Sequence, residues 1–479
     1  MFRFLLCSFI GIVALLFGTQ VVHSQTNFSL ADSLLTTSPN AIQVGDFNKD
    51  GNMDIIVANI LGSFTPGNVT IFFSSGGFHF DSTYQVAIGN QPARIFVADF
   101  NNDSYPDAAI TNSHSASVSI LINDGAGRLI ATQTLTTPYD CDGIAGGDFN
   151  GDGNIDLAVT SQVPSTLQIF LGDGNGNFTQ HDSSSSGLGT YPKIGVVADL
   201  DNDGDLDLAI PNELTGELSV FKNDGNANFT TSSPISIGAS CATSTSGDFN
   251  NDGNVDLALV KEDSNQVLIL FNDGTGNFPN SSRYSFNDTI NSLVSGDFNK
   301  DGKTDIAVAM KKGFVLMRNL CNGTFDIENK IITGYGAGRQ AIAAGDFDND
   351  GDLDIVKANM SSDNLSLIRN NFSNTEIARF APEMSKFYSL SQNYPNPFNP
   401  TTAIRFGLSV RSNVKIQIIN TLGQIVTTLV ESELEAGYQE VQWNASNAVS
   451  GIYFYRIEAV AADHPNNRFV DVKKMLLLK

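Results

Sequence analysis

A nine-residue pattern, D-x-[ND]-x-D-x-x-x-D, occurs seven times in this 479-residue chain and constrains its fold more than any other feature. The intervals between consecutive copies are 53, 49, 51, 49, 49 and 49 residues. The copies begin at Asp46, Asp99, Asp148, Asp199, Asp248, Asp297 and Asp346. A period near 50 residues over such a long stretch predicts a repeat architecture rather than several unrelated domains.

The chemistry of the nonapeptide indicates a loop that binds a hard cation. Oxygen-bearing side chains recur at alternate positions, and glycine occupies the sixth position in six of the seven copies. Ca²⁺ prefers about 6–8 oxygen ligands, and glycine permits the sharp turn that brings them together. An EF-hand would need an acidic residue at position twelve, where these copies have Val57, Ile110, Val159, Ile210, Leu259, Val308 and Lys357. The pattern therefore predicts up to seven Ca²⁺ ions with a structural role, and not EF-hands.

The strong negative charge follows largely from these loops. The chain has 51 acidic and 27 basic residues, a formal net charge of −24, and 25 of the acidic residues lie within the seven nonapeptides. A charge of this sign argues against nucleic acid and against anionic membrane surfaces as partners.

Short apolar runs separate the acidic loops and predict β-strands. Representative runs cover residues 118–124, 167–173, 218–224 and 267–273, and glycine-rich turns follow them. Four short strands per repeat of about 50 residues are typical of a propeller blade. The predicted fold is therefore all-β, with a seven-bladed β-propeller over residues 25–371. We expect Phe28–Leu35 to complete the seventh blade from outside, with residues 374–380 as the alternative closing strand.

The two ends of the chain differ from the repeats. Residues 1–24 are predicted to be a signal peptide, because Arg3 precedes an apolar run that is shorter than the roughly 20 residues of a membrane span. No transmembrane segment is expected in the mature chain. Residues 372–388 are predicted to be a linker, and residues 389–479 show alternating strands sufficient for a small C-terminal β-sandwich.

The acidic loops, together with the glycine-rich turns of pattern DGxGNF that follow the apolar runs, resemble the integrin-type FG-GAP and VCBS repeat families over residues 25–380. The resemblance implies that positions one, three, five and nine of each loop bind Ca²⁺ through side-chain oxygens. These residues are Asp46, Asn48, Asp50, Asp54, Asp99, Asn101, Asp103, Asp107, Asp148, Asn150, Asp152, Asp156, Asp199, Asp201, Asp203, Asp207, Asp248, Asn250, Asp252, Asp256, Asp297, Asn299, Asp301, Asp305, Asp346, Asp348, Asp350 and Asp354. Position seven would contribute its backbone carbonyl. The residues there are Asn52, Tyr105, Asn154, Asp205, Asn254, Lys303 and Asp352.

The seven loops are not expected to bind equally. Repeats four and seven carry five aspartates each and are predicted to bind most tightly. Repeat two should bind most weakly, since Ser104 replaces the glycine, and Lys303 should also weaken repeat six by its charge.

The last 90 residues resemble the C-terminal sorting domain of type IX secretion substrates. The matching segments are NYPNPFNPTTAIRF at 393–406, GIYFY at 451–455 and the terminal KKMLLLK. This resemblance implies recognition by the type IX secretion machinery. It also implies a secreted protein, released or attached to the outer cell surface after the signal peptide and sorting domain are removed.

If the propeller binds a ligand, the side opposite the metal loops is the expected place, around the channel mouth. The loops that enter the inner strands there carry Arg94, Tyr139, Asp140, Asp142, Tyr191, Lys193, Arg339 and Gln340. Mixed charge with tyrosine suits an extracellular carbohydrate or protein ligand. We expect a monomeric binding or adhesion module. The alternative is a secreted enzyme that acts on polysaccharide or lipid on the same scaffold.

Overall fold

The structure is a computed structural model of the 479-residue chain. The residues that it describes are 28–62, 64–193, 195–238, 241–320, 322–328, 330–334, 336, 341–372, 388–390, 393, 396, 398–421, 423–434, 437–446, 448–462 and 468–477. The predicted signal peptide, most of the predicted linker and the alternative closing strand at 374–380 lie outside these residues. The chain divides into two compact units, Met1–Phe372 and Ser373–Lys479, which are described separately.

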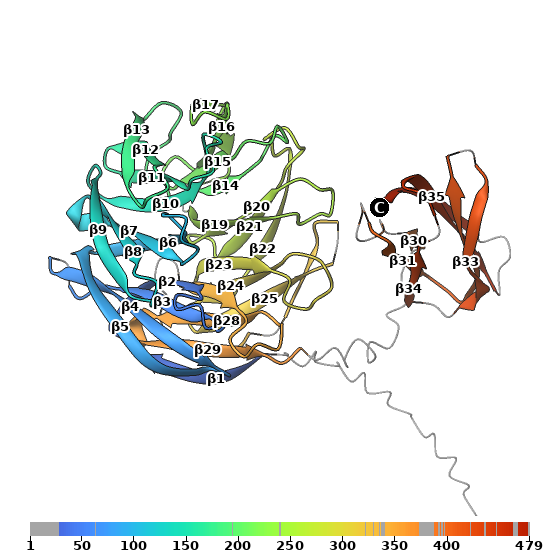
Figure 1. The fold of residues 1–479 in the computed structure, drawn as a ribbon, viewed down its shortest axis with the longest axis horizontal. Coiled ribbons are helices and arrows are strands. Elements are labelled where there is room, and N and C mark those ends of the chain that lie inside the picture. The colour runs from blue at the N-terminus through green and yellow to red at the C-terminus, as the bar shows by residue number, and fades with distance from the viewer. Residues whose placement is uncertain are drawn as a thin grey trace, which may run out of the picture. The chain divides into compact units, whose positions relative to one another are not determined.

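The first unit consists of antiparallel sheets that each carry one acidic loop, and we number these sheets as blades 1 to 7 after their loops (Figure 1). Blade 1 contains β2 (Pro39–Gly45), β3 (Asp54–Asn59), β4 (Pro66–Gly76) and β5 (His79–Asn90). Blade 2 contains β6 (Pro92–Ala98), β7 (Asp107–Asn112), β8 (Ser117–Asn123) and β9 (Leu129–Thr136). Blade 3 contains β10 (Cys141–Gly147), β11 (Asp156–Gln162), β12 (Ser165–Gly172) and β13 (Phe178–Ser184).

The remaining blades repeat this order. Blade 4 contains β14 (Val196–Ala198), β15 (Asp207–Asn212), β16 (Glu217–Asn223), β17 (Phe229–Thr231) and the short β18 (Ile235–Ser236). Blade 5 contains β19 (Cys241–Gly247), β20 (Asp256–Lys261), β21 (Gln266–Phe271) and β22 (Asn280–Ser285). Blade 6 contains β23 (Ile290–Gly296), β24 (Asp305–Met310), β25 (Gly313–Asn319) and β26 (Phe325–Ile327). Blade 7 contains β27 (Ile342–Gly345), β28 (Asp354–Asn359), β29 (Asn364–Asn370) and β1 (Phe28–Leu35).

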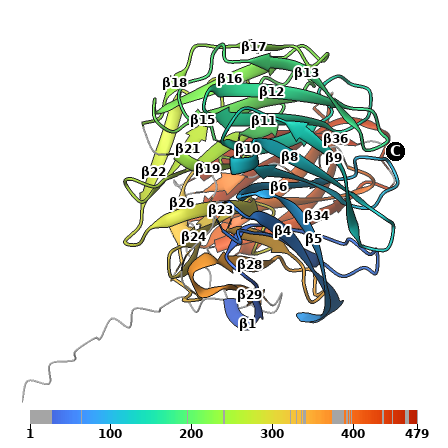
Figure 2. The ribbon, with the colours of Figure 1, turned by 90° about the vertical axis from the view of Figure 1, so that its left-hand side faces the viewer.

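The blades follow one another around a closed ring, which confirms the all-β propeller predicted from the sequence (Figures 1 and 2). The inner strand β27 of blade 7 contacts the inner strand β2 of blade 1. The N-terminal strand β1 pairs with β29 from Phe28↔Asn370 to Leu35↔Asn364. The first strand of the described chain therefore covers the outer edge of the last blade, as we expected.

The hydrophobic core lies between neighbouring blades. The second strand of each blade is buried along its whole length, as in Asp54–Asn59 of blade 1 and Asp354–Asn359 of blade 7. Side chains such as Val57 in blade 1 and Leu367 in blade 7 belong to one packed cluster. Burial on both sides explains why these strands appear in the sequence as short continuous apolar runs rather than as alternating ones.

The C-terminal unit has two sheets that share one core, in agreement with the predicted small sandwich. One sheet holds β30 (Ser389–Leu390), β31 (Thr401–Leu408) and β34 (Gly437–Asn444). The other holds β33 (Ile425–Leu434), β32 (Ser412–Asn420), β35 (Gly451–Ala461) and β36 (Arg468–Leu477). Trp443, Phe398 and Tyr455 are buried together in that core.

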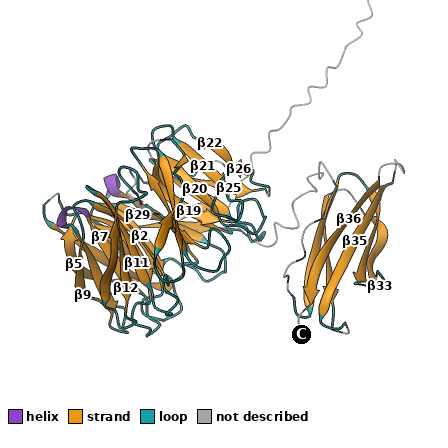
Figure 3. Ribbon diagram, turned by 90° about the horizontal axis from the view of Figure 1, so that it is seen from above, coloured by secondary structure: helices purple, strands orange, loops and turns teal. Residues whose placement is uncertain are grey.

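Two short 3-10 turns, η1 (Ser113–Ser115) and η2 (Met360–Ser362), are the helical elements that the described residues contain (Figure 3). Both lie in the first unit, between the second and third strands of blades 2 and 7.

One buried side chain departs from the repeat pattern. Lys357 lies in β28 at a position where the other blades have valine, isoleucine or leucine, and it is fully buried. Its Nζ donates hydrogen bonds to the Gly336 carbonyl at 2.9 Å and to Asn359 Oδ1 at 2.6 Å. Burial, and to a smaller extent the charge of Lys330, lowers the pKa of Lys357 to about 8. Blade 7 therefore holds a cation that is costly to bury.

Replacement of Lys357 by methionine should raise the stability of the protein at pH 7. The folded-state pKa is about 8 and the unfolded-state pKa is about 10.4, so the unfolded chain binds more protons between these values. Stability should therefore rise as the pH increases from 8 to about 10. We expect Lys357→Met to raise the free energy of unfolding at pH 7 by roughly 1–3 kcal/mol, since lost hydrogen bonds offset part of the gain. Denaturant unfolding at several pH values measures both effects.

The matched control for this substitution is Lys311→Met, which removes an exposed lysine that follows β24. It should leave stability within about 0.5 kcal/mol of the wild type. A wild-type protein whose stability does not rise between pH 8 and 10 would contradict the assignment of a costly charge to Lys357.

Candidate metal loops and the opposite rim

Each acidic loop connects the first and second strands of its blade and is folded by its own carboxylates. In blade 1, Asp46 accepts hydrogen bonds from the backbone N–H of Asp50 at 3.1 Å and of Gly51 at 2.9 Å. The first aspartate of blade 3 makes the equivalent contacts to the N–H groups of Asp152 at 3.1 Å and of Gly153 at 2.8 Å. The carboxylate at position one therefore wraps the loop around itself, which explains why an aspartate begins every copy.

The aspartate at position nine ties the loop to the body of the blade. Asp54 is fully buried and accepts hydrogen bonds from the N–H of Phe47 at 3.0 Å and of Ser74 at 2.8 Å. Burial, the largest cause, raises the pKa of this carboxyl to about 7, while the two backbone N–H groups oppose the rise. The same burial raises the pKa of Asp305 and Asp354 to about 7. Charge repulsion from neighbouring loop aspartates adds a smaller rise in the pKa, as Asp50 and Asp46 do for Asp54.

The second loop position anchors the loop to both its own blade and the next one. Phe47, Phe149 and Phe298 at this position are buried in the core. Their carbonyl oxygens accept hydrogen bonds from asparagines that end the third strand of the following blade. These bonds are Asn123 to Phe47 at 2.9 Å, Asn223 to Phe149 at 2.8 Å and Asn370 to Phe298 at 2.7 Å. Neighbouring blades thus hold each loop in place.

The oxygens of the loops fit a hard cation. In blade 4, one carboxylate oxygen from each of Asp199, Asp201 and Asp207 lies within 4.8 Å of the others, and Asp346, Asp348 and Asp354 form the same cluster in blade 7. Several buried carboxylate oxygens have no hydrogen-bond partner among the described residues, including Oδ1 of Asp201, Asp346 and Asp348. Buried, unpaired anionic oxygens are costly without a compensating charge. The clusters can therefore hold a metal ion.

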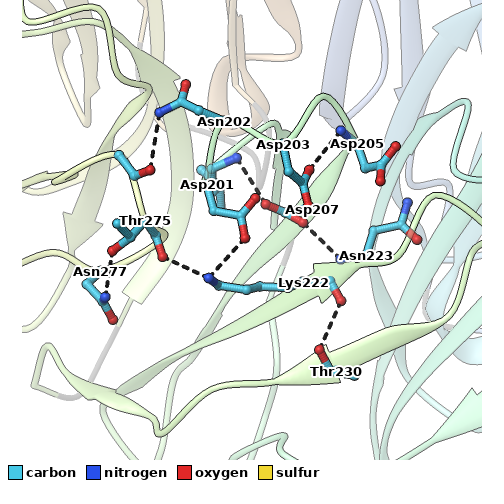
Figure 4. A network of polar contacts seen from close by, with 12 residues as sticks. Asp201, Asn202, Asp203, Asp205, Asp207, Lys222, Asn223, Thr230, Thr275 and Asn277 are labelled. Atoms are coloured by element: carbon cyan, nitrogen blue, oxygen red, sulfur yellow. Dashed lines mark hydrogen bonds and ion pairs between the residues drawn. The ribbon is translucent and has the colours of Figure 1, made fainter.

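Lysine and arginine side chains from elsewhere in the chain reach the two loops that are richest in aspartate. In blade 4, Lys222 Nζ lies 2.9 Å from Asp201 Oδ2 and donates a hydrogen bond to the Thr275 carbonyl at 2.9 Å (Figure 4). In blade 7, Arg369 Nε lies 3.2 Å from Asp348 Oδ2, and Lys300 forms an ion pair with Asp352. These cations offset part of the extra negative charge of the loops in repeats four and seven. The tighter Ca²⁺ binding predicted for these two repeats therefore depends on a smaller charge difference from the other loops.

The two loops predicted to be weak have local features that support the prediction. Ser104 in blade 2 has a φ of 68°, in the left-handed region that favours glycine. Lys303 in blade 6 forms a 2.8 Å ion pair with Asp301 Oδ2. A lysine that engages the position-five carboxylate competes with a metal for the same oxygen.

Adjacent loops also contact one another around the ring. The fourth residue of a loop adopts a positive φ in most blades and reaches the seventh residue of the next loop. Asn102 donates to Asn154 Oδ1 at 3.0 Å, Asn202 to Asn254 Oδ1 at 3.0 Å and Asn349 to Asn52 Oδ1 at 2.9 Å. Order in one loop can therefore support order in the next.

The predicted ligand residues of the opposite rim, where the inner strands begin, differ in how deeply their side chains are buried. Asp142 is fully buried and Lys193 is half-buried, and their charged groups lie 3.2 Å apart. Arg94 is also buried, and its backbone N–H donates a hydrogen bond to Thr111 Oγ1 at 3.1 Å. Tyr139 is exposed, whereas Asp140 and Tyr191 are partly exposed with positive φ values of 63° and 60°. Arg339 and Gln340 lie outside the described residues.

Sequence reasoning missed several residues of this rim. Glu213 Oε2 lies 2.9 Å from Lys193 Nζ, so one lysine joins two carboxylates from different blades. His114 stacks on Tyr139 with ring centroids 5.9 Å apart, and Phe64 stacks on His114 at 6.0 Å. Phe64 is 86% exposed. An isolated phenylalanine in the glycine- and proline-containing connection LGSFTPG at 61–67 was the available signal for this position.

We use "opposite rim" below for the six residues that these contacts join. They are Phe64, His114, Tyr139, Asp142, Lys193 and Glu213. They come from the connections and strand starts of blades 1 to 4, so the rim combines a three-ring aromatic stack with a partly buried ion-pair network.

Comparisons with known proteins agree with this architecture. The model of the FG-GAP-like repeat matches residues 46–110, 99–159, 148–210, 248–308 and 297–356. These matches cover more than half of the chain, and the chain belongs to the FG-GAP-like repeat family. The model of the secretion system C-terminal sorting domain matches residues 392–470. The protein is therefore secreted or attached to the outer cell surface by way of the type IX secretion machinery.

One of the similar solved structures, with a TM-score above 0.5, has the same fold at low sequence identity. BBS1N, solved in complex with ARL6DN, is 12% identical with a TM-score of 0.53, and the match covers 72% of this chain and 98% of that chain. A functionally unknown protein from Desulfotomaculum acetoxidans is 10% identical with a TM-score of 0.47 and coverages of 78% and 95%. The extracellular domain of the putative hybrid two component system BT3049 from B. thetaiotaomicron is 10% identical with a TM-score of 0.45 and coverages of 95% and 57%. No curated protein matches the sequence. In the part of the chain that is described, no helix has the length and apolar character needed to cross a membrane.

Proposed function

We propose that this protein is a secreted, calcium-stabilised binding module that engages an extracellular carbohydrate or protein through its opposite rim. Ca²⁺ is the cation that we assign to the acidic loops, since all of their donors are hard oxygens. Bound there, it would neutralise carboxylates that otherwise repel one another. The residues that would hold it in blade 7, for example, are Asp346, Asp348, Asp350 and Asp354, with the Asp352 carbonyl.

The observation that carries the binding role is the exposed stack of Phe64, His114 and Tyr139. Phe64 remains 86% exposed and Tyr139 51% exposed although each contacts the histidine ring. Large exposed aromatic rings are unusual on a surface without a partner, and aromatic side chains are enriched at the centres of binding sites. Stacking against the histidine restricts the rotamers of both rings, and side chains restricted before binding lose less entropy on binding.

The ion-pair network beside the stack gives the rim rigid polar groups. Lys193 engages Asp142 at 3.2 Å and Glu213 at 2.9 Å, and Gln162 Nε2 donates to Asp142 Oδ2 at 2.8 Å. Aromatic faces next to ordered polar groups suit a sugar ring, which presents both C–H faces and hydroxyls, and they also suit a protein surface. These features support a binding role for this face.

The test is a screen of the full chain against glycans and extracellular matrix proteins, with and without Ca²⁺. For a ligand found in this way, Phe64→Ala and Tyr139→Ala should each weaken binding by about fivefold or more, which corresponds to roughly 1 kcal/mol. The matched control is Ile130→Ala, which removes an exposed side chain from the outer strand of blade 2. Equal binding by the wild type and both aromatic variants would exclude the rim as the binding surface.

The second function considered from the sequence is an enzyme that acts on polysaccharide or lipid. The same screen addresses this alternative when the reaction mixtures are analysed for shortened glycans or released acyl chains. Turnover that depends on Asp142 or Glu213 would favour the enzyme over the binding module.

A further inference from the structure

A cavity of about 280 Å³ lies at the seam where the N-terminal segment passes from blade 7 into blade 1. We call it the seam cavity. Hydroxyl and amide side chains form most of its wall, and these are Thr36, Thr37, Asn59, Asn68, Thr70, Thr83 and Gln85. They come from the connection between β1 and β2 and from β3, β4 and β5. None of them belongs to the opposite rim or to an acidic loop.

Asn59 fixes the direction of the hydrogen bonds in this wall. Its Oδ1 accepts a hydrogen bond from Thr36 Oγ1 at 2.8 Å. Its Nδ2 donates to Asn68 Oδ1 at 2.8 Å and to Thr70 Oγ1 at 2.9 Å. Because Thr70 and Asn68 already accept from Asn59, the hydroxyl proton of Thr70 and the amide protons of Asn68 are left to donate. Thr36 is oriented in the opposite sense, with its oxygen lone pairs left to accept.

The same buried asparagine occurs in other blades, but there the chain covers it closely. In blade 2, Asn112 donates to Ser119 Oγ at 3.0 Å, and in blade 4, Asn212 donates to Ser219 Oγ at 2.9 Å. Glycines lie against these two asparagines: a Cβ added to Gly89 would come within 2.7 Å of Asn112, and one added to Gly189 within 2.8 Å of Asn212. The seams of these blades therefore have no room for a side chain.

Thr36 is the residue that differs at the seam of blade 1. Gly89 and Gly189 each stand ten residues before the first aspartate of their loop, and Thr36 occupies this position before Asp46. Since a Cβ at this place would clash with the asparagine in the close arrangement, the threonine segment must pass farther from Asn59. The substitution of threonine for glycine thus accounts for the cavity and adds a hydroxyl to its wall.

The lining chemistry selects the class of ligand. Among the described residues that line the cavity there is no Asp, Glu, Lys, Arg or His, so nothing compensates a charged ligand. Phe72 and Leu35 add apolar surface beside the hydroxyls and amides. A compact molecule with several hydroxyl groups and apolar C–H faces matches this combination. The volume is at the lower end of the roughly 300–1,000 Å³ of small-molecule sites, which suits one ring rather than a long chain.

We propose that the seam cavity binds a single unit of a neutral sugar, as a site separate from the opposite rim. Thr70 and Asn68 donate hydrogen bonds to the sugar hydroxyls, Thr36 accepts one, and Gln85 borders the open side, where its amide can contact the sugar. Thr70 is only 2% exposed, so its hydroxyl is positioned by the surrounding sheet. Gln85 and Thr83 lie on the outer strand β5 and are exposed, which leaves the cavity open to solvent at that edge.

The experiment is saturation-transfer NMR of the full chain with glucose, galactose and mannose as separate probes, followed by titration of the sugar that gives the strongest signal. Thr70→Val, which keeps the side-chain shape and removes the hydroxyl, should weaken binding about fivefold, as expected for one neutral hydrogen bond. Thr36→Gly should weaken it at least as much, because the seam can then close as in blades 2 and 4. Gln85→Leu tests the exposed side and carries little risk to folding.

Two controls separate this site from the rest of the molecule. Ser119→Ala changes the residue of blade 2 that occupies the place of Thr70, at a covered seam, and should leave sugar binding unchanged. Phe64→Ala should also leave it unchanged, so the outcome is independent of the proposed function. The absence of a signal from all three sugars, or equal affinity in wild type and in folded Thr70→Val and Gln85→Leu variants, would overturn the proposal.

Discussion

Removal of calcium should lower the melting temperature of this protein by about 10 °C or more. A site that is filled at a free Ca²⁺ concentration of 100 times its Kd contributes roughly 2.7 kcal/mol to the folded state, and several sites act together. The physical reason is that burying these carboxylates in their ionised form is costly without a cation, and burial raises the pKa of Asp54, Asp305 and Asp354 to about 7. Thermal unfolding in EGTA and in excess Ca²⁺ measures the difference.

A pair of charge-removing variants in blade 3 makes this experiment specific to the loops. Asp152 at loop position five accepts the Asn154 N–H at 2.8 Å, an interaction that Asp152→Asn preserves. This variant should melt at a lower temperature than wild type in Ca²⁺ and at about the same temperature in EGTA. Asp182→Asn, on the exposed strand β13, should match wild type in both buffers. An identical melting curve with and without EGTA, after metal removal has been verified, would rule out a structural role for calcium.

Loss of the Phe28 side chain should destabilise the propeller by about 3–5 kcal/mol, the usual cost of truncating a buried phenylalanine. Phe28 is 6% exposed, and its ring contacts Phe314 at 5.3 Å and Phe298 at 6.3 Å between centroids. These two partners belong to blade 6 and its loop. Although β1 is the outer strand of blade 7, its first residue therefore also packs against blade 6. Denaturant unfolding of Phe28→Ala measures the loss.

The control for this prediction lies on the same strand. Leu30 is 54% exposed, and Leu30→Ala should change stability by no more than about 0.5 kcal/mol. Deletion of residues 25–35 should have a larger effect than Phe28→Ala, because it also exposes the edge of β29 and favours association of chains through that edge. Wild-type stability in Phe28→Ala would show that β1 does not contribute to closure of the ring in solution.

The acidic repeat explains why so much of the fold could be predicted. The position-one and position-nine aspartates are bonded mainly within their own blade, as with Asp46 to the N–H of Gly51 and Asp54 to the N–H of Phe47. Interactions over so few residues leave a fixed spacing in the sequence. The buried second strands leave a similar local trace as short apolar runs.

Contacts that occur in only one or two blades leave no such fixed spacing in the sequence. Lys222 and Asp201 meet across one blade, whereas Lys300 and Asp352 come from two blades. The stack of Phe64, His114 and Tyr139 is assembled from three connections, and nothing in any one of them indicates the other two. The seam cavity likewise depends on a threonine that replaces a glycine at a position whose neighbours become visible only in the folded ring.

The sequence by itself thus determined the repeat, the strand order within a blade, the acidic loops and the export signal at the C-terminus. Each of these depends on residues that are close to one another in the sequence. Only the tertiary structure decided which cations reach the loops, that Asp142 and Glu213 share Lys193, and that Thr36 opens a cavity. These contacts join residues about 20 to 50 positions apart, and they form only when ring closure sets the register of each blade against the next.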